Sequence, residues 1–401
     1  MTGTREVVDF PIPRECPYHP PAVYAEARAE GPLFRVRLYD GRVAWLVTRY
    51  ADVRALFADA DRFSSNRDNP DFPIPAERER HFREFFRTLA GLDGEAHKTR
   101  RSMLVGRFTV RQVDRLRPYI QRTTDLLIDR MLDAGPPADL ISALGRPLPS
   151  MVISELLGVP YADHERFEKW SQGLMHAPTA EEAWESGQQL VAYMDALIKE
   201  KEAEPTDDLL GTLITERMHT GELTREELVR LALAVLAAGH ETTASMIGLG
   251  TLTLLEHPDQ LDVLKADPGA ALRVVDELSR FLSVADLTTL RVVTEDVEVG
   301  GQLVRAGEGV ILSTAAANRD PDVYPEPDRL DVSRQARNNL AFGFGPHRCV
   351  GENLARAELE IVFGTLFRRV PKLRLAMPLD EIPRKVGMTL EGMLELPVTW
   401  T

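Results

Sequence analysis

Residues 342–351 read FGFGPHRCVG, a stretch in which three glycines, one proline and two phenylalanines surround a single cysteine, Cys349. Glycine permits backbone conformations that other residues resist, so this loop can curl until backbone N–H groups point at the sulfur. A helix is predicted directly after the loop, and the positive end of its dipole also favours a thiolate. The loop is therefore expected to present Cys349 as a ligand or a nucleophile. An inert buried cysteine, the usual alternative, does not explain the glycine spacing.

A second unusual stretch lies in a predicted helix over residues 224–257. A capping box, Thr224 with Glu227, begins it, and Pro258 ends it. The centre of this helix is apolar on all sides, which indicates that it runs through the protein interior, yet it contains GHETT at 239–243. A carboxylate and a glycine inside a buried helix both cost stability. The pattern predicts a groove that holds a polar ligand or water beside Glu241, or else a helix that leaves the core there with Glu241 in solvent.

The rest of the chain is mostly helical in pattern, and we expect one domain over residues 1–401, mainly α with small β-sheets. Hairpins are predicted around Asp40-Gly41, at Gly300-Gly301 between the runs 291–299 and 302–312, and near Glu391-Gly392. A β-rich lobe is expected from residues 30–48, 291–312 and 385–400. The further predicted helices cover residues 97–133, 150–157, 161–175, 181–204 and 352–369.

Composition excludes several classes of protein. The net charge of −14 argues against a general nucleic-acid binder, which needs concentrated positive charge. The longest apolar run, residues 231–239, is less than half of the roughly 20 residues that a membrane span needs. The two cysteines, Cys16 and Cys349, form neither a CxxC motif nor a disulfide framework, and the N-terminus has no apolar signal segment. We expect a cytoplasmic protein that binds no membrane.

Together these motifs resemble those of the soluble bacterial members of the cytochrome P-450 family. FGFGPHRCVG matches the family's FGxGxHxCxG heme-ligand signature at every fixed position, and AGHETT at 238–243 matches its oxygen-activation motif. Glu277 and Arg280 match its ExxR motif, and the three motifs stand in the family's order. The sequence departs from the pattern at Gly94, where relatives usually have proline, and at Leu330, where phenylalanine is common; both departures concern loop placement.

The resemblance implies the P-450 fold, a long central helix over a heme b group with Cys349 as the axial thiolate ligand of its iron. Phe342 would pack beside the heme next to the sulfur. His97 and Arg101, four residues apart on one helix face, would clamp a propionate, and Ala238 with Gly239 would leave room above the heme. The full set of residues implied to bind the cofactor is His97, Arg101, Ala238, Gly239, Arg291, Phe342, Gly343, His347, Cys349 and Gly351.

The resemblance also assigns catalytic and structural roles. Thr242 would hydrogen-bond dioxygen, and Glu241 would relay protons from solvent. Glu277 and Arg280, with Arg329 of the segment Pro-Asp-Arg at 327–329, would form a buried ion network that supports the heme-loop side of the fold. No role follows for His240.

The implied activity is that of a monooxygenase, which inserts one oxygen atom from O2 into an apolar small molecule. C–H hydroxylation is the default outcome, and epoxidation or oxidative coupling would use the same chemistry. The sequence looks most like actinomycete enzymes that tailor polyketides, macrolides and other secondary metabolites. A peroxide-driven enzyme, or a heme-thiolate sensor without turnover, are the alternatives. The substrate pocket would be lined by residues 66–89, 170–184, 236–242, 284–289 and 388–391.

The chain carries no flavin or iron–sulfur motif, so the resemblance implies that electrons come from a ferredoxin with its reductase. We expect a monomer, with the ferredoxin docking on the Cys349 side. Lys98, Arg100, Arg348 and Arg356 could make a basic patch there, although ordinary solvated charges are an equal interpretation.

Overall fold

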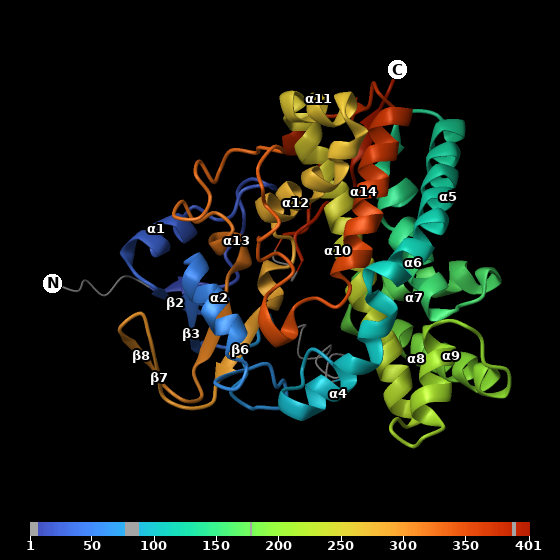
Figure 1. The fold of residues 1–401 in the computed structure, drawn as a ribbon. Helices are drawn as coiled ribbons and strands as arrows, with labels where there is room; N and C mark the ends of the chain where they lie inside the picture. Colours follow the sequence, from blue (N-terminus) through green and yellow to red (C-terminus); the bar gives the residue numbers. More distant parts are fainter. Residues whose placement is uncertain (1–6, 77–87, 177–178, 387–389) are drawn as a thin grey trace.

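The computed structural model describes residues 7–76, 88–176, 179–386 and 390–401. It is mainly helical with three small sheets, as the sequence predicted. Figure 1 shows the strands β2, β3 and β6 on one side of the molecule with the helices α1 and α2, while α4 to α12 and α14 fill the other side. None of the helices in the described ranges is long and apolar enough to cross a bilayer.

The longest helix, α10 (Arg225–Glu256), begins with the predicted capping box: the Thr224 side chain accepts from the Glu227 N–H, and the Glu227 side chain accepts from the Thr224 N–H. Most of its residues are buried on every side, so it is the axis on which the helical part is assembled. Its chief neighbours are α6 (Pro147–Leu157), α8 (Ala180–Ala203) and α14 (Glu352–Arg369).

The predicted helix over 97–133 is wrong as a single element. It is divided into α4 (Gly94–Val105) and α5 (Val110–Ala134), because the chain tightens into a 3₁₀ turn at Gly106–Phe108. The predicted helices at 150–157, 181–204, 224–257 and 352–369 are confirmed, and 161–175 is a turn followed by α7 (His164–His176). The remaining α-helices in the described residues are α1 (Val23–Glu30), α2 (Tyr50–Ala58), α9 (Leu209–Leu213), α11 (Pro258–Ala266), α12 (Ala271–Leu282) and α13 (Thr314–Ala317).

The main sheet has six strands in the order β1-β2-β3-β9-β6-β4. The hairpin predicted at Asp40-Gly41 is confirmed, with Leu33 opposite Val47 in the antiparallel pair β2–β3. The runs predicted as single strands at 291–299 and 302–312 each divide in two, and Gly300-Gly301 joins only the inner halves, β7 and β8. The strand bounds are β1 Val8–Asp9, β2 Leu33–Arg37, β3 Val43–Val47, β4 Phe63–Ser64, β6 Leu290–Val293, β7 Val297–Val299, β8 Gln302–Val304 and β9 Gly309–Leu312.

The C-terminal residues do not join this sheet, which corrects the expectation that residues 385–400 contribute to the same β-rich lobe. β11 (Pro397–Thr399) pairs instead with β5 (Ala138–Asp139) and β10 (Arg374–Leu375) beside the helices. The hairpin predicted near Glu391-Gly392 is an isolated bridge between Arg384 and Met393, and residues 387–389 lie outside the described part of the chain. Backbone pairing with β5 and β10, rather than with the main sheet, decides where this tail lies.

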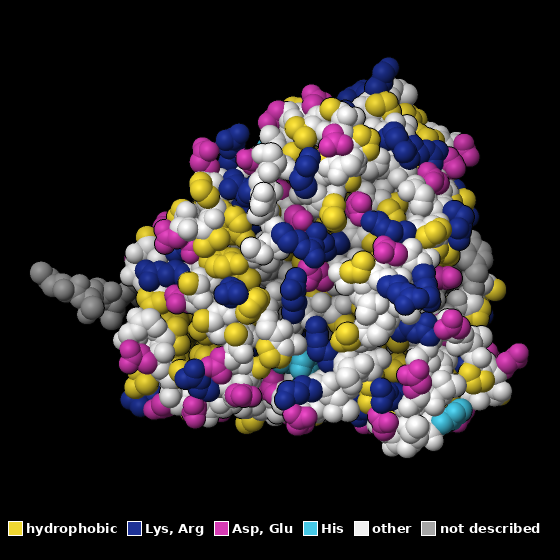
Figure 2. Space-filling view, in the orientation of Figure 1, with side chains coloured by type: hydrophobic (Ala, Val, Ile, Leu, Met, Phe, Trp, Pro, Cys, Tyr) yellow, Lys and Arg dark blue, Asp and Glu magenta, His cyan; other side chains and the backbone are white. Residues whose placement is uncertain are grey.

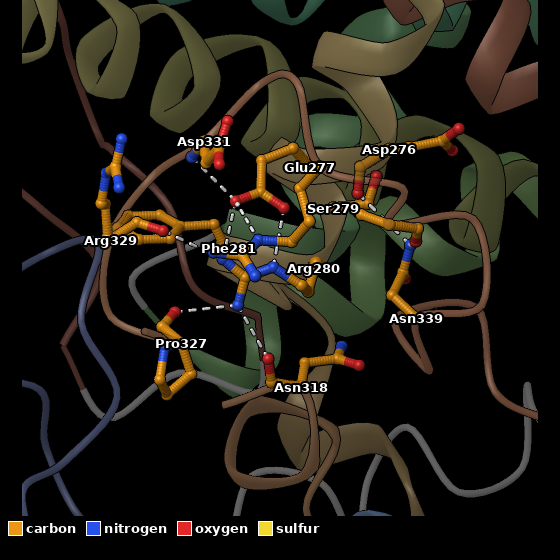
Figure 3. Close-up of polar contacts among 12 residues, drawn as sticks. Asp276, Glu277, Ser279, Arg280, Phe281, Asn318, Pro327, Arg329, Asp331 and Asn339 are labelled. Atoms are coloured by element: carbon orange, nitrogen blue, oxygen red, sulfur yellow. Dashed lines mark hydrogen bonds and ion pairs between the residues drawn. The ribbon is translucent and has the colours of Figure 1, made fainter. Parts of the chain in front are cut away.

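The helix α12 (Ala271–Leu282) holds the predicted buried ion pair. Arg280 donates from Nε and Nη2 to the two carboxylate oxygens of Glu277, both at 2.7 Å, and both side chains are fully buried (Figure 3). Nη1 of Arg280 also donates to the backbone carbonyls of Asn318 and Pro327, both at 2.9 Å. The Asp331 N–H donates to Glu277 at 3.0 Å. The pair therefore ties α12 to the long segment that leads to the cysteine loop.

The prediction that the Arg329 side chain joins this network is wrong. Only its backbone carbonyl accepts from Arg280, at 3.4 Å, whereas its side chain is 61% exposed and pairs with Glu326 (Figure 3). The segment 327–329 contacts the ion pair through its backbone carbonyls, so the side chain of Arg329 points away from the pair. The second arginine at Glu277 is Arg334, at 3.4 Å.

Replacing one partner of the Glu277–Arg280 pair tests how much the pair contributes to the free energy of unfolding. We expect Glu277→Gln to lower the free energy of unfolding by about 3–5 kcal/mol, because it leaves a buried guanidinium without its counter-charge. Arg329→Ala is the matched control and should change stability by less than about 0.5 kcal/mol. Urea unfolding followed by circular dichroism measures both. Equal midpoints for the two variants would contradict the assignment.

Candidate active site

The cysteine loop is folded by its own backbone. The Cys349 N–H donates to the Phe342 carbonyl at 2.8 Å, and the Gly343 N–H donates to the Leu340 carbonyl at 2.9 Å. Gly343 and Gly345 both have φ near +70°, which only glycine adopts readily. A Cβ on Gly345 would also lie 2.5 Å from the Phe57 carbonyl oxygen at the end of α2. The glycine spacing is thus a requirement of the loop's shape and of its contact with α2.

The loop directs backbone N–H groups at the sulfur, as predicted. The Gly351 and Glu352 N–H groups hydrogen-bond to Cys349 at the start of α14, and together with Arg101 they lower the pKa of the thiol. Burial is the larger effect, however, and the net result is a raised pKa, contrary to the thiolate expected from the sequence. The Cys349 side chain is nevertheless accessible. A positively charged partner at the sulfur would favour the thiolate.

On α10, one face of the buried helix is open. Ala238 is exposed and Thr242, one turn later, is half-buried, although nearly all of their neighbours are buried. The Thr242 hydroxyl donates to the Ala238 carbonyl at 2.8 Å. Gly239 does not share this face, since a Cβ there would lie 3.1 Å from Cδ1 of Ile153 in α6. The expectation that Gly239 leaves room for a ligand is therefore wrong: its small size lets α6 approach α10.

Glu241 is 3% exposed, so the alternative of a solvated carboxylate at the helix centre is excluded. It forms an ion pair with Lys385, which is buried as well. The sequence analysis missed Lys385, and no local pattern marks it, because it follows Glu241 by 144 positions. His240 is also buried and contacts the Arg146 carbonyl at 3.2 Å.

Four basic side chains gather near the cysteine. The rings of His97 and His347 stack with centroids 4.0 Å apart, Arg291 is 6% exposed, and Arg101 acts electrostatically on Cys349. Burial, His347 and Arg101 lower the pKa of His97 to about 4. Burial lowers the pKa of Arg291 to about 10.

Carboxylates are scarce in this cluster. Asp93 lies 3.3 Å from Nε2 of His347, but within the described residues no carboxylate forms an ion pair with Arg101 or Arg291. Arg291 donates only to its neighbour's carbonyl, at 2.7 Å, and lies 5.6 Å from the Phe57 ring. Buried charges are normally paired, so this cluster fits a bound group that carries carboxylates of its own.

Comparison with known proteins agrees with this geometry. The family model "Cytochrome P-450" matches residues 19–267 and 271–390. The chain belongs to the cytochrome P-450 family. It is an oxidoreductase of the monooxygenase class, and the family implies a heme-iron cofactor, O2, a redox partner and a small-molecule substrate.

Three relatives show how far the likeness extends. Pentalenic acid synthase from Streptomyces avermitilis is 53% identical over all of this chain and 99% of its own. Vitamin D3 dihydroxylase from Streptomyces griseolus is 47% identical over 99% of this chain and 98% of its own. The crystal structure of cytochrome P-450 MoxA from Nonomuraea recticatena superposes with a TM-score of 0.93 at 46% identity, covering 98% of each chain.

The residues present fit a heme. The accessible thiol of Cys349 can bind iron, and the side chains of His97, Arg101, Arg291 and His347 can donate hydrogen bonds to two propionates. Of the stretches predicted to line the substrate pocket, residues 77–87, 177–178 and 388–389 lie outside the described residues. In the described remainder, residues 236–242 carry the open face at Ala238.

The basic patch expected for a redox partner is smaller than predicted. Arg356 is 5% exposed and pairs with Asp276, with Nη2 at 2.9 Å from the carboxylate, so it cannot join a surface patch. Arg100 is mostly buried and pairs with Glu227. Lys98 and Arg348 remain exposed. The prediction failed because it assumed that Arg100 and Arg356 are solvated, whereas both form ion pairs with carboxylates distant in sequence.

The contact between Gly345 and α2 can be separated from backbone strain. We expect Gly345→Ala to lower the free energy of unfolding by at least about 1 kcal/mol more than Gly301→Ala. Both glycines have positive φ, but a Cβ on Gly301 meets nothing within 4 Å. Thermal unfolding of the two variants makes the comparison. Equal losses would mean that α2 does not constrain the loop.

Proposed function

We propose that this P-450 inserts one atom of O2 into a C–H bond of an apolar small molecule, with heme b held by Cys349. The observation that carries the proposal is the accessible thiol of Cys349 beside four basic side chains, of which, within the described residues, only His347 forms an ion pair with a carboxylate, Asp93. Such an arrangement suits a group that bears both a metal and two carboxylates.

In this proposal the bound heme supplies oxygen activation, favoured by the thiolate of Cys349. Its propionates are held by His97, Arg101, Arg291 and His347, and Phe342, Gly343 and Gly351 shape the loop that presents the sulfur. The negative charges of the propionates offset the repulsion among these basic side chains. Binding of the cofactor therefore stabilises a cluster that is unfavourable by itself.

The open face of α10 provides the proton-handling groups. The Thr242 hydroxyl, which donates to the Ala238 carbonyl, is the proton-bearing atom on that face. Glu241, the residue before Thr242 in the chain, is the acid that supplies this proton. The small side chain of Ala238 leaves space for O2 and for the substrate. A peroxide-driven reaction needs no such acid, so the Thr242–Glu241 pair supports O2 as the oxidant.

The substrate class is proposed from the pocket and from the relatives. Val284 and Leu287, in one of the stretches predicted to line the pocket, are apolar and each is 6% exposed. Apolar lining with few polar groups is typical of sites for apolar ligands. One relative is named for the dihydroxylation of vitamin D3 and another for the synthesis of pentalenic acid. We infer hydroxylation of a polyketide, macrolide or other secondary metabolite, with epoxidation or oxidative coupling as variants of the same chemistry.

The electron donor is proposed to be a ferredoxin with its reductase, acting on a cytoplasmic monomer. Figure 2 shows Lys and Arg side chains gathered across the middle of the face that carries α14 and α4, on a protein with a net charge of −14. Arg348 stands one residue before Cys349 and is exposed, so it marks the centre of the proposed docking surface. Complementary charge of this kind speeds the encounter with an acidic partner.

Thr242 offers the direct test of this function. We expect Thr242→Val to lower the product formed per NADPH consumed by about tenfold or more, because the variant lacks the hydroxyl that carries the proton. Thr253→Val is the matched control: its hydroxyl makes the same bond to a carbonyl four residues back, at 2.7 Å, elsewhere on α10. The assay uses ferredoxin, reductase and a substrate found by its shift of the heme spin state. Full coupling in Thr242→Val would refute the proposed role.

A further inference from the structure

Lys385 lies between the C-terminal segment and α10. Its Nζ donates to Oε1 of Glu241 and lies 3.2 Å from Oγ of Ser245, one turn further along the helix. Its backbone N–H donates to the Gly392 carbonyl at 2.9 Å. A Cβ on Gly392 would lie 2.7 Å from Oγ of Ser245, so only glycine allows the segment to lie this close to α10. The backbone thus fixes the lysine directly over Glu241.

The same lysine also lines a cavity that opens to solvent. The wall of the cavity combines the N-terminal proline-rich segment with residues 384–386 and 391–392 of the C-terminal segment, and with Leu249 of α10 and Leu287. Val386, next to Lys385, belongs to this wall and is 61% exposed. The charged residues in the wall are Arg14, Arg384, Lys385 and Glu391. Lys385 therefore has Glu241 on one side and a charged, open cavity on the other.

Burial and the charge of Arg146 favour release of the proton from Lys385, whereas the paired carboxylate of Glu241 opposes it. Burial first, and then Arg146, lower the pKa of Lys385 to about 8, while Glu391 opposes them. Glu391 is itself engaged by Arg14 at 3.2 Å. On α10 the groups that face Lys385 are the Glu241 carboxylate and the Ser245 hydroxyl, while His240 contacts the Arg146 carbonyl. A lysine with this pKa exists in both protonation states near neutral pH, unlike an ordinary lysine.

We propose that Lys385 conducts protons from this cavity to Glu241, an inference that rests on the relay role proposed above for Glu241. In the step, an N–H bond of the ammonium breaks and an O–H bond forms on the Glu241 carboxylate. The pair passes from ammonium and carboxylate to amine and carboxylic acid, so its net charge stays zero. Water in the cavity then returns a proton to the amine. Because Glu241 is buried, this route replaces the direct contact with solvent that the sequence suggested.

Lys385→Arg separates proton transfer from ion pairing. Arginine preserves the positive charge beside Glu241 but cannot be deprotonated in a protein. We expect Lys385→Arg to retain the heme spectrum and the unfolding midpoint of the wild type, while product formation falls by about tenfold or more. The matched control is Lys201→Arg, in a buried pair with Asp208 at 2.5 Å outside the site. It should retain full product formation.

The pH dependence of coupling distinguishes a lysine that transfers protons from one that only stabilises the structure. Raising the pH through about 8 removes the proton from Lys385, so wild-type coupling should fall above that value. The fall should be absent in Lys385→Arg, whose residual rate is independent of pH in this range. A wild-type rate and profile in Lys385→Arg would overturn the inference.

A spectroscopic measurement on the wild-type holoenzyme keeps the inference testable whatever the variant's stability. Nuclear magnetic resonance of protein labelled with ¹³C-lysine, assigned by the signal missing from Lys385→Arg or Lys385→Met, should show Lys385 titrating below about 9. Titration at the ordinary lysine value of about 10.4 would overturn it. Glu241→Gln separates the two proposals. If coupling falls in Glu241→Gln but not in Lys385→Arg, only the role of Lys385 is wrong. If neither variant loses coupling, the relay role of Glu241 is wrong too.

Discussion

Four basic side chains around one accessible thiol, two of them buried and two partly buried, form the constraint on which the rest of the structure depends. They come from separate parts of the chain: His97 and Arg101 from α4, Arg291 from β6 and His347 from the cysteine loop. Burial lowers the pKa values of His97 and Arg291, and the charges of His347 and Arg101 lower that of His97 further. A fold that assembles such a cluster is complete only with a negatively charged group bound to it. The heme proposed here supplies that charge through its propionates and a metal for the thiol.

The second constraint is the polar centre of α10. A helix that is buried along most of its length accepts Glu241 in its interior because Lys385 pairs with it across the fold. The helix therefore needs the C-terminal segment, whose close approach depends on Gly392. On the opposite side, Gly239 admits α6. Gly392 and Gly239 thus determine both how α10 packs and where its reactive groups lie.

Local patterns in the sequence were sufficient for some features and insufficient for others. The capping box at Thr224, the turn at Gly300-Gly301 and the cysteine loop were predictable, because each depends on residues adjacent in the chain. The division of the helix at 97–133 was missed, since a single glycine, Gly106, does not by itself end a helical pattern. Contacts between distant residues were the main source of error. Arg356 pairs with Asp276, 80 positions away, and Lys385 pairs with Glu241. Neither pair leaves a pattern in the sequence around its members.

The ligation of the heme by Cys349 is the central claim, and one spectrum tests it most directly. The purified protein is reduced, exposed to carbon monoxide and examined in the Soret region. The account predicts a strongly red-shifted band that is lost in Cys349→His. A wild-type band at the shorter wavelength typical of histidine or neutral thiol ligation would contradict it, as would the absence of a heme band in protein produced with ample heme.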